Sequence, residues 1–241
     1  MKKRILLITL LLTLTFTLTG CRLGLHPHTN AGPTIYRTLT KQNFNEIDAN
    51  VSLLDFKLKP SDTSKVVFHG GKKLTPQVKV KNGKLIIREK HHFLITINDN
   101  QENLLTIYLP RQQLKRIAID TSDGDITSNG KIAANKLDLS SDDGDITADF
   151  LQVNKGSVSS DDGDLQINRL RSTAGFKADS DDGDITINNS NATGFDLSSD
   201  DGDVTCRGHN YDDDAGGSYQ HHRRSKNVLI AHSDDGDVEV N

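Results

Sequence analysis

The sequence predicts an all-β protein, arranged as a parallel β-solenoid, a β-helix-like stack of rungs with a β-rich N-terminal cap. Three observations predict this fold: an acidic glycine-centred motif recurs, short apolar runs alternate with polar residues, and large side chains are scarce. Hydrophobic residues make up 34% of the 241 residues, with no Trp and one Met. Such a composition suits many thin layers better than one thick core.

The motif recurs with a regular period. It reads SSDDGDIT at Ser140 to Thr147 and SSDDGDVT at Ser198 to Thr205. Successive copies are separated by 20, 19, 20, 19 and 34 residues, counted between their central glycines. A rung of this length cannot bury its own apolar face, but stacked rungs share a continuous core, so the period indicates a solenoid. The central glycines are Gly124, Gly144, Gly163, Gly183, Gly202 and Gly236.

Each copy, aligned on its glycine, contains two short strands joined by the acidic turn. Positions seven and five before the glycine, and two and four after it, are mostly apolar, which predicts inward faces of period two. An antiparallel meander of hairpins would give the same alternation, and it is the competing topology. It would place aspartates of one hairpin directly opposite each other, which is destabilising. We therefore favour the parallel stack.

A small hydroxyl residue stands three positions before every motif glycine. By parity these side chains point inward beside the turn, and we expect a column whose hydroxyls bond to one another or to turn backbone. Generic turn filling by Ser is the alternative. The residues are Thr121, Ser141, Ser160, Ser180, Ser199 and Ser233.

The turn aspartates have a local explanation and a functional one. Asp tolerates left-handed backbone and bonds neighbouring amides, while Gly supplies positive φ. Stacking would also line the carboxylates up in columns, which must stay solvated or bind cations, and calcium accepts many oxygen ligands. The candidate calcium ligands are Asp143, Asp145, Asp162, Asp164, Asp182, Asp184, Asp201 and Asp203.

The expected organisation has four parts. Residues 1–20 read as a signal peptide, with a basic start and an apolar run, and residues 21–35 as a flexible tether. Residues 36–112 form the N-terminal β region, in which Asn82 and Gly83 stand between alternating strands and predict a hairpin. Residues 113–241 form the solenoid, with a loop insertion at 209–226. Cys206 falls on an inward position and should be a buried, inert side chain.

The string LTGC at Leu18 to Cys21 resembles the bacterial lipobox, which implies a lipid attached to Cys21 and a location on the extracytoplasmic face of a cell membrane. Removal of residues 1–20 takes away three of the 29 Lys and Arg and none of the 33 Asp and Glu, leaving a formal charge of −7. A mildly acidic ectodomain argues against nucleic acid as a partner.

Two segments are candidates for contact with a partner, either an envelope protein or a glycan. In the inserted loop the candidate residues are Tyr211, Tyr219, His221, His222, Arg223 and Arg224, which we expect on a surface loop outside the stack. The chain also ends in VEVN without a polar capping segment, so we expect the C-terminal rung to offer an open strand edge for self-association.

The strings KVVFHG, VKNGKLIIREK and LLTIYLP, followed by repeated SDDGDI, together resemble the DUF4097 family, often labelled "putative adhesin". The resemblance covers roughly Phe44 to Asn241. It implies a β-strand repeat solenoid and no catalytic residues. Some members of the family belong to envelope-stress circuits.

The sequence therefore favours a non-catalytic lipoprotein of the cell envelope, acting as an adhesin-like surface binding module or as an envelope-stress sensor. No motif of a nucleophilic, zinc-dependent or nucleotide-binding enzyme occurs in it. A calcium-dependent carbohydrate-active enzyme, using the acidic face of a β-helix, is one alternative, and a purely structural spacer is the other. No cofactor is expected, apart from the calcium already considered.

Overall fold

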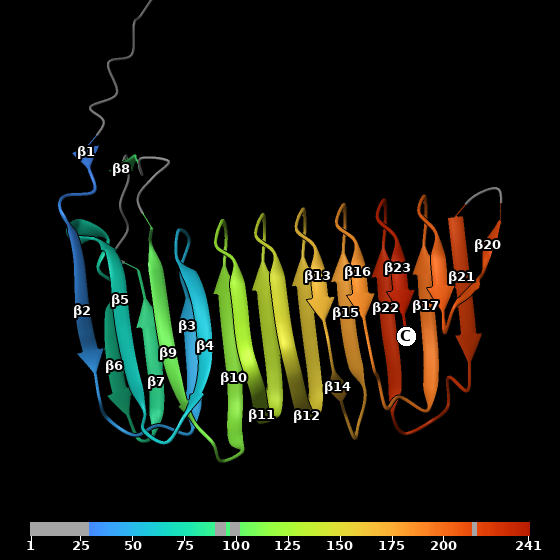
Figure 1. Cartoon of the computed structure of the whole chain (residues 1–241), viewed down its shortest axis with the longest axis horizontal. Helices are drawn as coiled ribbons and strands as arrows, with labels where there is room; N and C mark the ends of the chain where they lie inside the picture. Colours follow the sequence, from blue (N-terminus) through green and yellow to red (C-terminus); the bar gives the residue numbers. More distant parts are fainter. Residues whose placement is uncertain (1–28, 90–94, 97–101, 214–215) are drawn as a thin grey trace, which may run out of the picture.

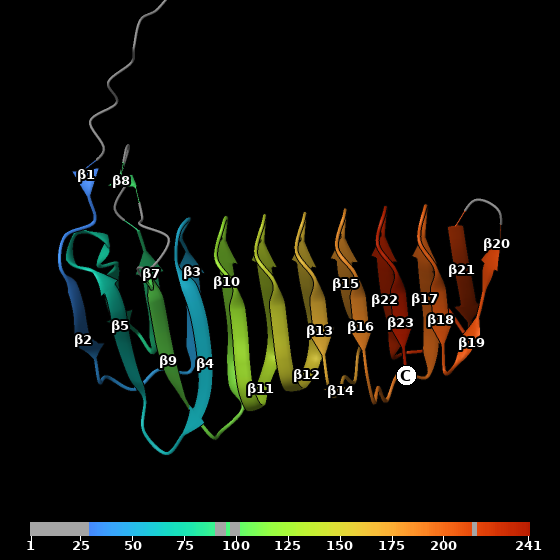
Figure 2. The ribbon, with the colours of Figure 1, turned by 45° about the horizontal axis from the view of Figure 1, so that its top comes forward.

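The computed structural model describes residues 29–89, 95–96, 102–213 and 216–241. They form one long stack of β-rungs, apart from residues 29–30 and 95–96, which pair with each other in a separate small sheet (Figures 1 and 2). Its first part contains β1 (Thr29–Asn30), β2 (Thr34–Thr40), β3 (Glu46–Asn50), β4 (Asp55–Ser61), β5 (Lys65–Gly71), the 3-10 helix η1 (Lys72–Leu74), β6 (Gln77–Lys81), β7 (Lys84–Arg88), β8 (Ile95–Thr96) and β9 (Leu104–Pro110).

The repeats contain β10 (Leu114–Thr121), β11 (Ile126–Ser141), β12 (Ile146–Ser160), β13 (Leu165–Ile167), β14 (Leu170–Arg171), β15 (Phe176–Ser180), β16 (Ile185–Ile187), β17 (Gly194–Ser199), β18 (Val204–Cys206), β19 (His209–Asn210), β20 (Asp212–Asp213), β21 (Gly216–His221), β22 (Val228–Ser233) and β23 (Val238–Val240). The described residues contain one short 3-10 helix and no α-helix, so they include no helix that could span a membrane. The predicted all-β class is confirmed.

Two layers of strands face each other across the core. We call layer A the run β6, β7, β3, β10, β11, β12, β15, β22, β17, β21 and β20. Layer B is the run β2, β5, β9, β4, β11, β12, β13, β16, β23, β18 and β19. The long strands β11 and β12 bend and belong to both layers.

The repeats stack in parallel and in register. Leu139 of β11, for example, pairs with Ile119 on one side and with Val158 on the other. The predicted parallel stack is therefore confirmed over the antiparallel meander, and residues at equal motif positions form continuous files. In one of these files a large side chain is stacked on a glycine. Phe176 pairs with Gly156, where an added Cβ would lie 2.7 Å from the Phe176 ring.

The rungs do not stack in chain order. β22 pairs with β15 on one side and β17 on the other, and β23 lies likewise between β16 and β18. In Figure 1 these C-terminal strands, drawn dark red, lie between two orange rungs. The rung around Gly236 is thus inserted between those around Gly183 and Gly202.

A buried asparagine holds the inserted rung at its start. The Asn227 side-chain amide donates to the backbone carbonyls of Ser172, at 2.9 Å, and Asn191, at 3.2 Å. Its Oδ1 accepts from the Ser172 hydroxyl, at 2.7 Å, and from the Gly175 N–H, at 3.2 Å. Because these partners come from the rungs on both sides, Asn227 fits only between them.

The expected free edge at the C-terminal rung is wrong, because both edges of β22 and β23 are already paired. The inserted segment, expected to leave the stack as a surface loop, instead folds back on the last rung. β21 pairs antiparallel with β17, β19 with β18, and β20 with β21. This segment is the terminal cap, and its short outer strand β20 carries the exposed Asp212, a charged residue that suits a sheet edge.

The other end of the stack is also closed by antiparallel strands. β6 and β7 form the predicted hairpin, with φ of 51° at Asn82 and 77° at Gly83, as a type I′ turn requires. The tether expected over residues 21–35 is too long, since Ala31 is buried and its carbonyl accepts from the Lys73 N–H at 3.0 Å. The chain is therefore docked on the cap before residue 35.

A column of serine hydroxyls joins the turns of successive rungs by hydrogen bonds. The Ser160 hydroxyl accepts a hydrogen bond from the Gly163 N–H of its own turn, at 3.1 Å, and donates to the Gly144 carbonyl of the rung below, at 2.9 Å. Ser141, Ser180, Ser199 and Ser233 make the same pair of contacts in their rungs. The predicted hydroxyl column is confirmed, with turn backbone as its partner.

The motif glycines are required by close approach and not by positive φ, so the sequence-based explanation of them was wrong. None of the six has φ in the left-handed range, and neither does any turn aspartate. A Cβ at Gly163 would instead lie 2.3 Å from the carbonyl oxygen of Gly144. At four further motif glycines an added Cβ would lie within 2.4 Å of the carbonyl oxygen of a stacked glycine, and at Gly124 it would meet the carbonyl oxygen of Leu54.

We expect Gly163→Ala to lower the free energy of unfolding by about 3 kcal/mol, because the added methyl must push two rungs apart. Urea titration followed by circular dichroism measures it. Asp162→Ala, an exposed change in the same turn, is the matched control and should alter stability by less than about 0.5 kcal/mol. Equal effects of the two variants would contradict the close-approach explanation.

Candidate functional site

The carboxylates that follow the motif glycines form a ladder along the turn edge of the stack. Each except the last, Asp203, accepts a hydrogen bond from the backbone N–H of the matching aspartate in the next rung, as Asp145 Oδ1 does from Asp164 N at 2.9 Å. The ladder runs in spatial order through Asp55, Asp125, Asp145, Asp164, Asp184, Asp237 and Asp203. These carboxylates therefore hold one rung on the next.

The carboxylates before the glycines are exposed and repel one another. Desolvation and the neighbouring carboxylates, among them Asp181 and Asp142, raise the pKa of Asp161 above its ordinary value. The pKa of Asp123 is raised in the same way, with Asp143 as its main charged neighbour. Because both side chains face solvent, the repulsion is strongly screened and modest in energy.

The candidate calcium ligands divide between these two files. Asp145, Asp164, Asp184 and Asp203 belong to the ladder, while Asp143, Asp162, Asp182 and Asp201 belong to the exposed file. In the part of the chain that the structure describes, no three His, Cys, Asp or Glu side chains converge on one point. Calcium binding by the turns stays a prediction.

The aromatic and basic residues predicted to contact a partner lie close together on the terminal cap. Ring centroids are 4.4 Å apart between Tyr211 and Tyr219, 6.2 Å between Tyr219 and His221, and 3.8 Å between His221 and His222. Tyr219 also packs on Phe195 of the last rung, at 6.3 Å. We call Tyr211, Tyr219, His221, His222, Arg223 and Arg224 the tip patch.

Arg207, Arg223 and Arg224 lie in or beside the tip patch, and Asp196 of β17 and Asp212 of β20 are carboxylates near it. Both Arg223 and Arg224 are exposed, and Arg223 contacts Asp196 at 2.8 Å and the Gln220 side chain at 3.2 Å. Arg207 lies over the Phe195 ring with its Cζ 5.0 Å from the centroid. Residues 220–224 border an open hollow of about 500 Å³. The patch therefore offers donors and ring faces together, a composition common in protein interfaces.

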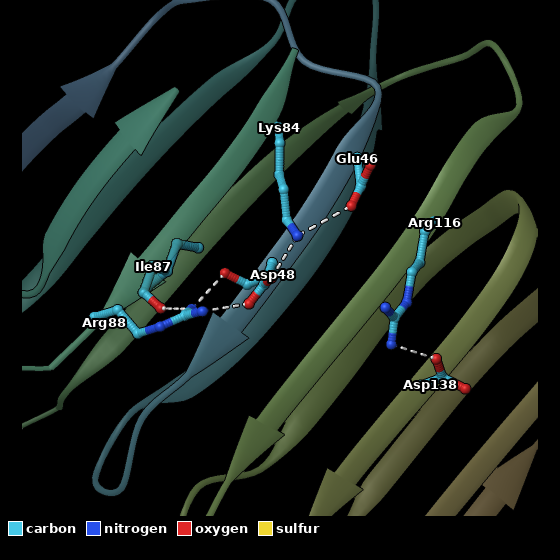
Figure 3. A network of polar contacts seen from close by, with 7 residues as sticks. All are labelled: Glu46, Asp48, Lys84, Ile87, Arg88, Arg116 and Asp138. Atoms are coloured by element: carbon cyan, nitrogen blue, oxygen red, sulfur yellow. Dashed lines mark hydrogen bonds and ion pairs between the residues drawn. The ribbon is translucent and has the colours of Figure 1, made fainter. Parts of the chain in front are cut away.

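The outer face of layer A near the first cap is charge-balanced, in contrast to the tip. In Figure 3, Lys84 contacts Glu46 at 3.2 Å and Asp48 at 2.6 Å, and Arg88 contacts the same Asp48 at 2.5 Å. The Lys84 and Arg88 cations hold the pKa of Asp48 below its usual range. Arg116 and Asp138, 3.0 Å apart, continue the pattern on the next strands. Each of these charged side chains therefore already has a partner of opposite sign, as does Lys136, which lies 3.1 Å from Asp138.

The tip patch lies at the end of the stack opposite β2, where the described chain begins (Figures 1 and 2). Cys21, the predicted lipid attachment point, lies outside the described residues. Cys206 is buried at 2% exposure, and burial raises the pKa of its thiol, which agrees with the inert role expected for it.

We expect Asp142→Asn, Asp161→Asn and Asp181→Asn together to raise the melting temperature at pH 7 by about 3 °C in low salt. A carboxyl whose pKa is raised on folding destabilises the fold above its unfolded pKa, so the gain should fade as the pH falls below about 4. Calorimetry in chelator measures it. An unchanged or lower melting temperature at pH 7 would contradict the repulsion.

Comparison with known proteins identifies relatives of this stack. A solved structure from Bacteroides fragilis, described as a "putative adhesin", matches with a TM-score of 0.51 at 16% identity, covering 88% of this chain and all of that one. A "putative cell adhesion protein" from Clostridium sporogenes matches at 15% identity and TM-score 0.46, over 86% of this chain and 98% of that one. A search of the curated proteins found no match.

The match to the Bacteroides fragilis structure shows a shared fold and nothing more at that identity. The sequence match is broader. The model of the Toastrack DUF4097 family matches residues 44–241, which include every rung of the stack, the inserted C-terminal rung and the terminal cap. The chain therefore belongs to the Toastrack DUF4097 family.

Proposed function

We propose that this chain is a non-catalytic binding module of the cell envelope, anchored by a lipid on Cys21, whose tip patch contacts an acidic partner surface. The lipobox-like LTGC string supports the anchor and the extracytoplasmic location. Adhesion to another surface and sensing of an envelope component both need such a contact. The proposal covers both roles.

The position of the tip patch is the observation that carries this proposal. A stack tethered at its N-terminal end presents the opposite end farthest from the membrane. At that end the chain places exposed His and Arg side chains beside partly buried Tyr rings, although the ectodomain as a whole carries a formal charge of −7. A local cationic surface on an acidic protein steers anionic partners to one site.

The turn carboxylates support a scaffold over a glycan-active enzyme. Three of the eight candidate aspartates, Asp145, Asp164 and Asp184, accept a backbone N–H of the next rung, so their role in the fold is already defined. The printed descriptions of the Bacteroides fragilis and Clostridium sporogenes proteins concern adhesion, which agrees with a binding role. A purely structural spacer would not require an aromatic and basic end.

Binding of the intact protein to isolated envelope fractions tests the proposal. We expect His221→Ala with Arg224→Glu to weaken this binding at least about tenfold, because two contacts of about 1 kcal/mol each are lost. The matched control is Lys79→Ala with Lys81→Glu, exposed changes on β6 at the other end of the stack, which should bind as the parent does.

Treatment of the fractions before binding identifies the partner class. Loss of binding after protease indicates an envelope protein, and loss after periodate oxidation indicates a glycan. Equal binding by the tip variant and the parent would overturn the proposal, as would binding by neither.

A further inference from the structure

A groove on the outer face of layer A is formed by two successive rungs and the inserted C-terminal rung. It opens over β12, β15 and β22, and β22 lies next to β15 only because the C-terminal rung is inserted. Its volume is about 370 Å³, within the range of small-molecule sites. We call it the lysine groove, after Lys155, Lys177 and Lys226, which line it.

The hollow exists because one outward side chain is missing. On the neighbouring strands the equivalent outward positions are Lys155 and Val228, but β15 is preceded there by Gly175. Gly175 has φ of +94°, and its N–H is held by the Asn227 side chain at 3.2 Å. A larger residue is strained at this φ, so the gap in the face is a fixed feature of the fold.

The floor and one wall of the groove are apolar. Gly156 and Phe176 form part of the floor, and Val228 and Ile230 of the inserted strand form the wall. Ile230 is 39% exposed, and the only other large hydrophobic side chain exposed among the described residues is Tyr36. Exposed aliphatic surface inside a concavity is a feature of ligand sites.

The charge around this apolar surface is positive. Lys155 and Lys226 are exposed, and neither makes an ion pair within the part of the chain that the structure describes. Lys177 contacts Asp179 of its own strand at 2.9 Å, so one of the three cations is already balanced. Two uncompensated ammonium groups therefore remain beside the aliphatic wall. They favour a ligand that carries an acidic group.

We propose that the lysine groove binds an anionic amphiphile, a molecule with one phosphate or carboxylate group on an aliphatic body. The acidic group lies between Lys155 and Lys226, and the aliphatic part lies on Val228 and Ile230. This binding is separate from the contact made by the tip patch, and it does not rest on the function proposed above. Lys226 comes from the end of the inserted segment, so the site requires the inserted order of rungs.

Titration calorimetry with octyl phosphate, kept monomeric, tests the proposal on the intact protein. We expect saturable binding of one molecule, at least about tenfold tighter than that of inorganic phosphate, because the octyl chain buries apolar surface. Octyl trimethylammonium has the same chain with the opposite charge and should not bind.

Variants locate the site. Lys155→Gln with Lys226→Gln should weaken octyl phosphate binding at least about tenfold, and Ile230→Ser about threefold, without a change in melting temperature, since all three side chains are exposed. Lys57→Gln with Lys59→Gln removes the same charge from the outward positions of β4, in layer B, and should bind as the parent does.

Three results would overturn the proposal. One is the absence of saturable octyl phosphate binding. Another is unchanged binding in Lys155→Gln with Lys226→Gln, because the ligand would then lie elsewhere. The third is binding to phosphatidylglycerol vesicles without binding of the monomeric probe, which would make this face a membrane contact instead of a ligand site. The variant His221→Ala with Arg224→Glu should still bind octyl phosphate, which separates this proposal from the proposed function of the tip patch.

Discussion

The close contact between stacked turns is the interaction on which the rest of the structure depends. A glycine carbonyl of one rung meets the glycine of the next with no room for a Cβ, and a buried serine hydroxyl bonds to both turns. This contact fixes the register of neighbouring rungs, because a shift of one residue would place a side chain against the carbonyl. The apolar files and the aspartate ladder follow from that register. Each rung adds only a few aliphatic side chains to the core, so repetition of one contact replaces a thick interior.

The insertion of the C-terminal rung gives an otherwise uniform stack its distinct surfaces. It moves the rung around Gly202 to the outside, where residues 209–221 close it with antiparallel strands that carry the tip patch. It also brings Lys226, Val228 and Ile230 next to β15, which creates the lysine groove. Asn227 stabilises this order by hydrogen bonds to the rungs on either side. Both candidate binding surfaces therefore depend on one topological feature.

The sequence could predict the contacts that recur in every rung, but it could not predict features that occur at one place in the stack. Inward files, parallel register, the hydroxyl column and the Asn82–Gly83 turn all follow from local pattern, because neighbouring copies contact each other in the same way. The spatial order of the last two rungs was missed, since copies with nearly equal motifs can stack in either order. The only signal was Asn227, a polar residue just before an inward-facing strand, together with the long spacing of 34 residues before Gly236. The reason for the motif glycines was also misassigned, because a clash between rungs far apart in sequence leaves no trace in the residues of one turn. The tip residues were found as a group, but their role in closing the stack was not.

Disulfide trapping between layer A strands measures the central claim, the inserted and in-register stack, most directly. In a Cys206→Ala background, Lys177→Cys with Ile230→Cys places two outward thiols on paired positions of adjacent parallel strands. Their Cα atoms should be about 5 Å apart, within reach of a disulfide, so mild oxidation should crosslink them rapidly. Lys177→Cys with Asp196→Cys would be adjacent only if the rungs followed chain order, and in this fold β22 separates the two strands. The account predicts rapid crosslinking of the first pair and none of the second. The reverse result would contradict it.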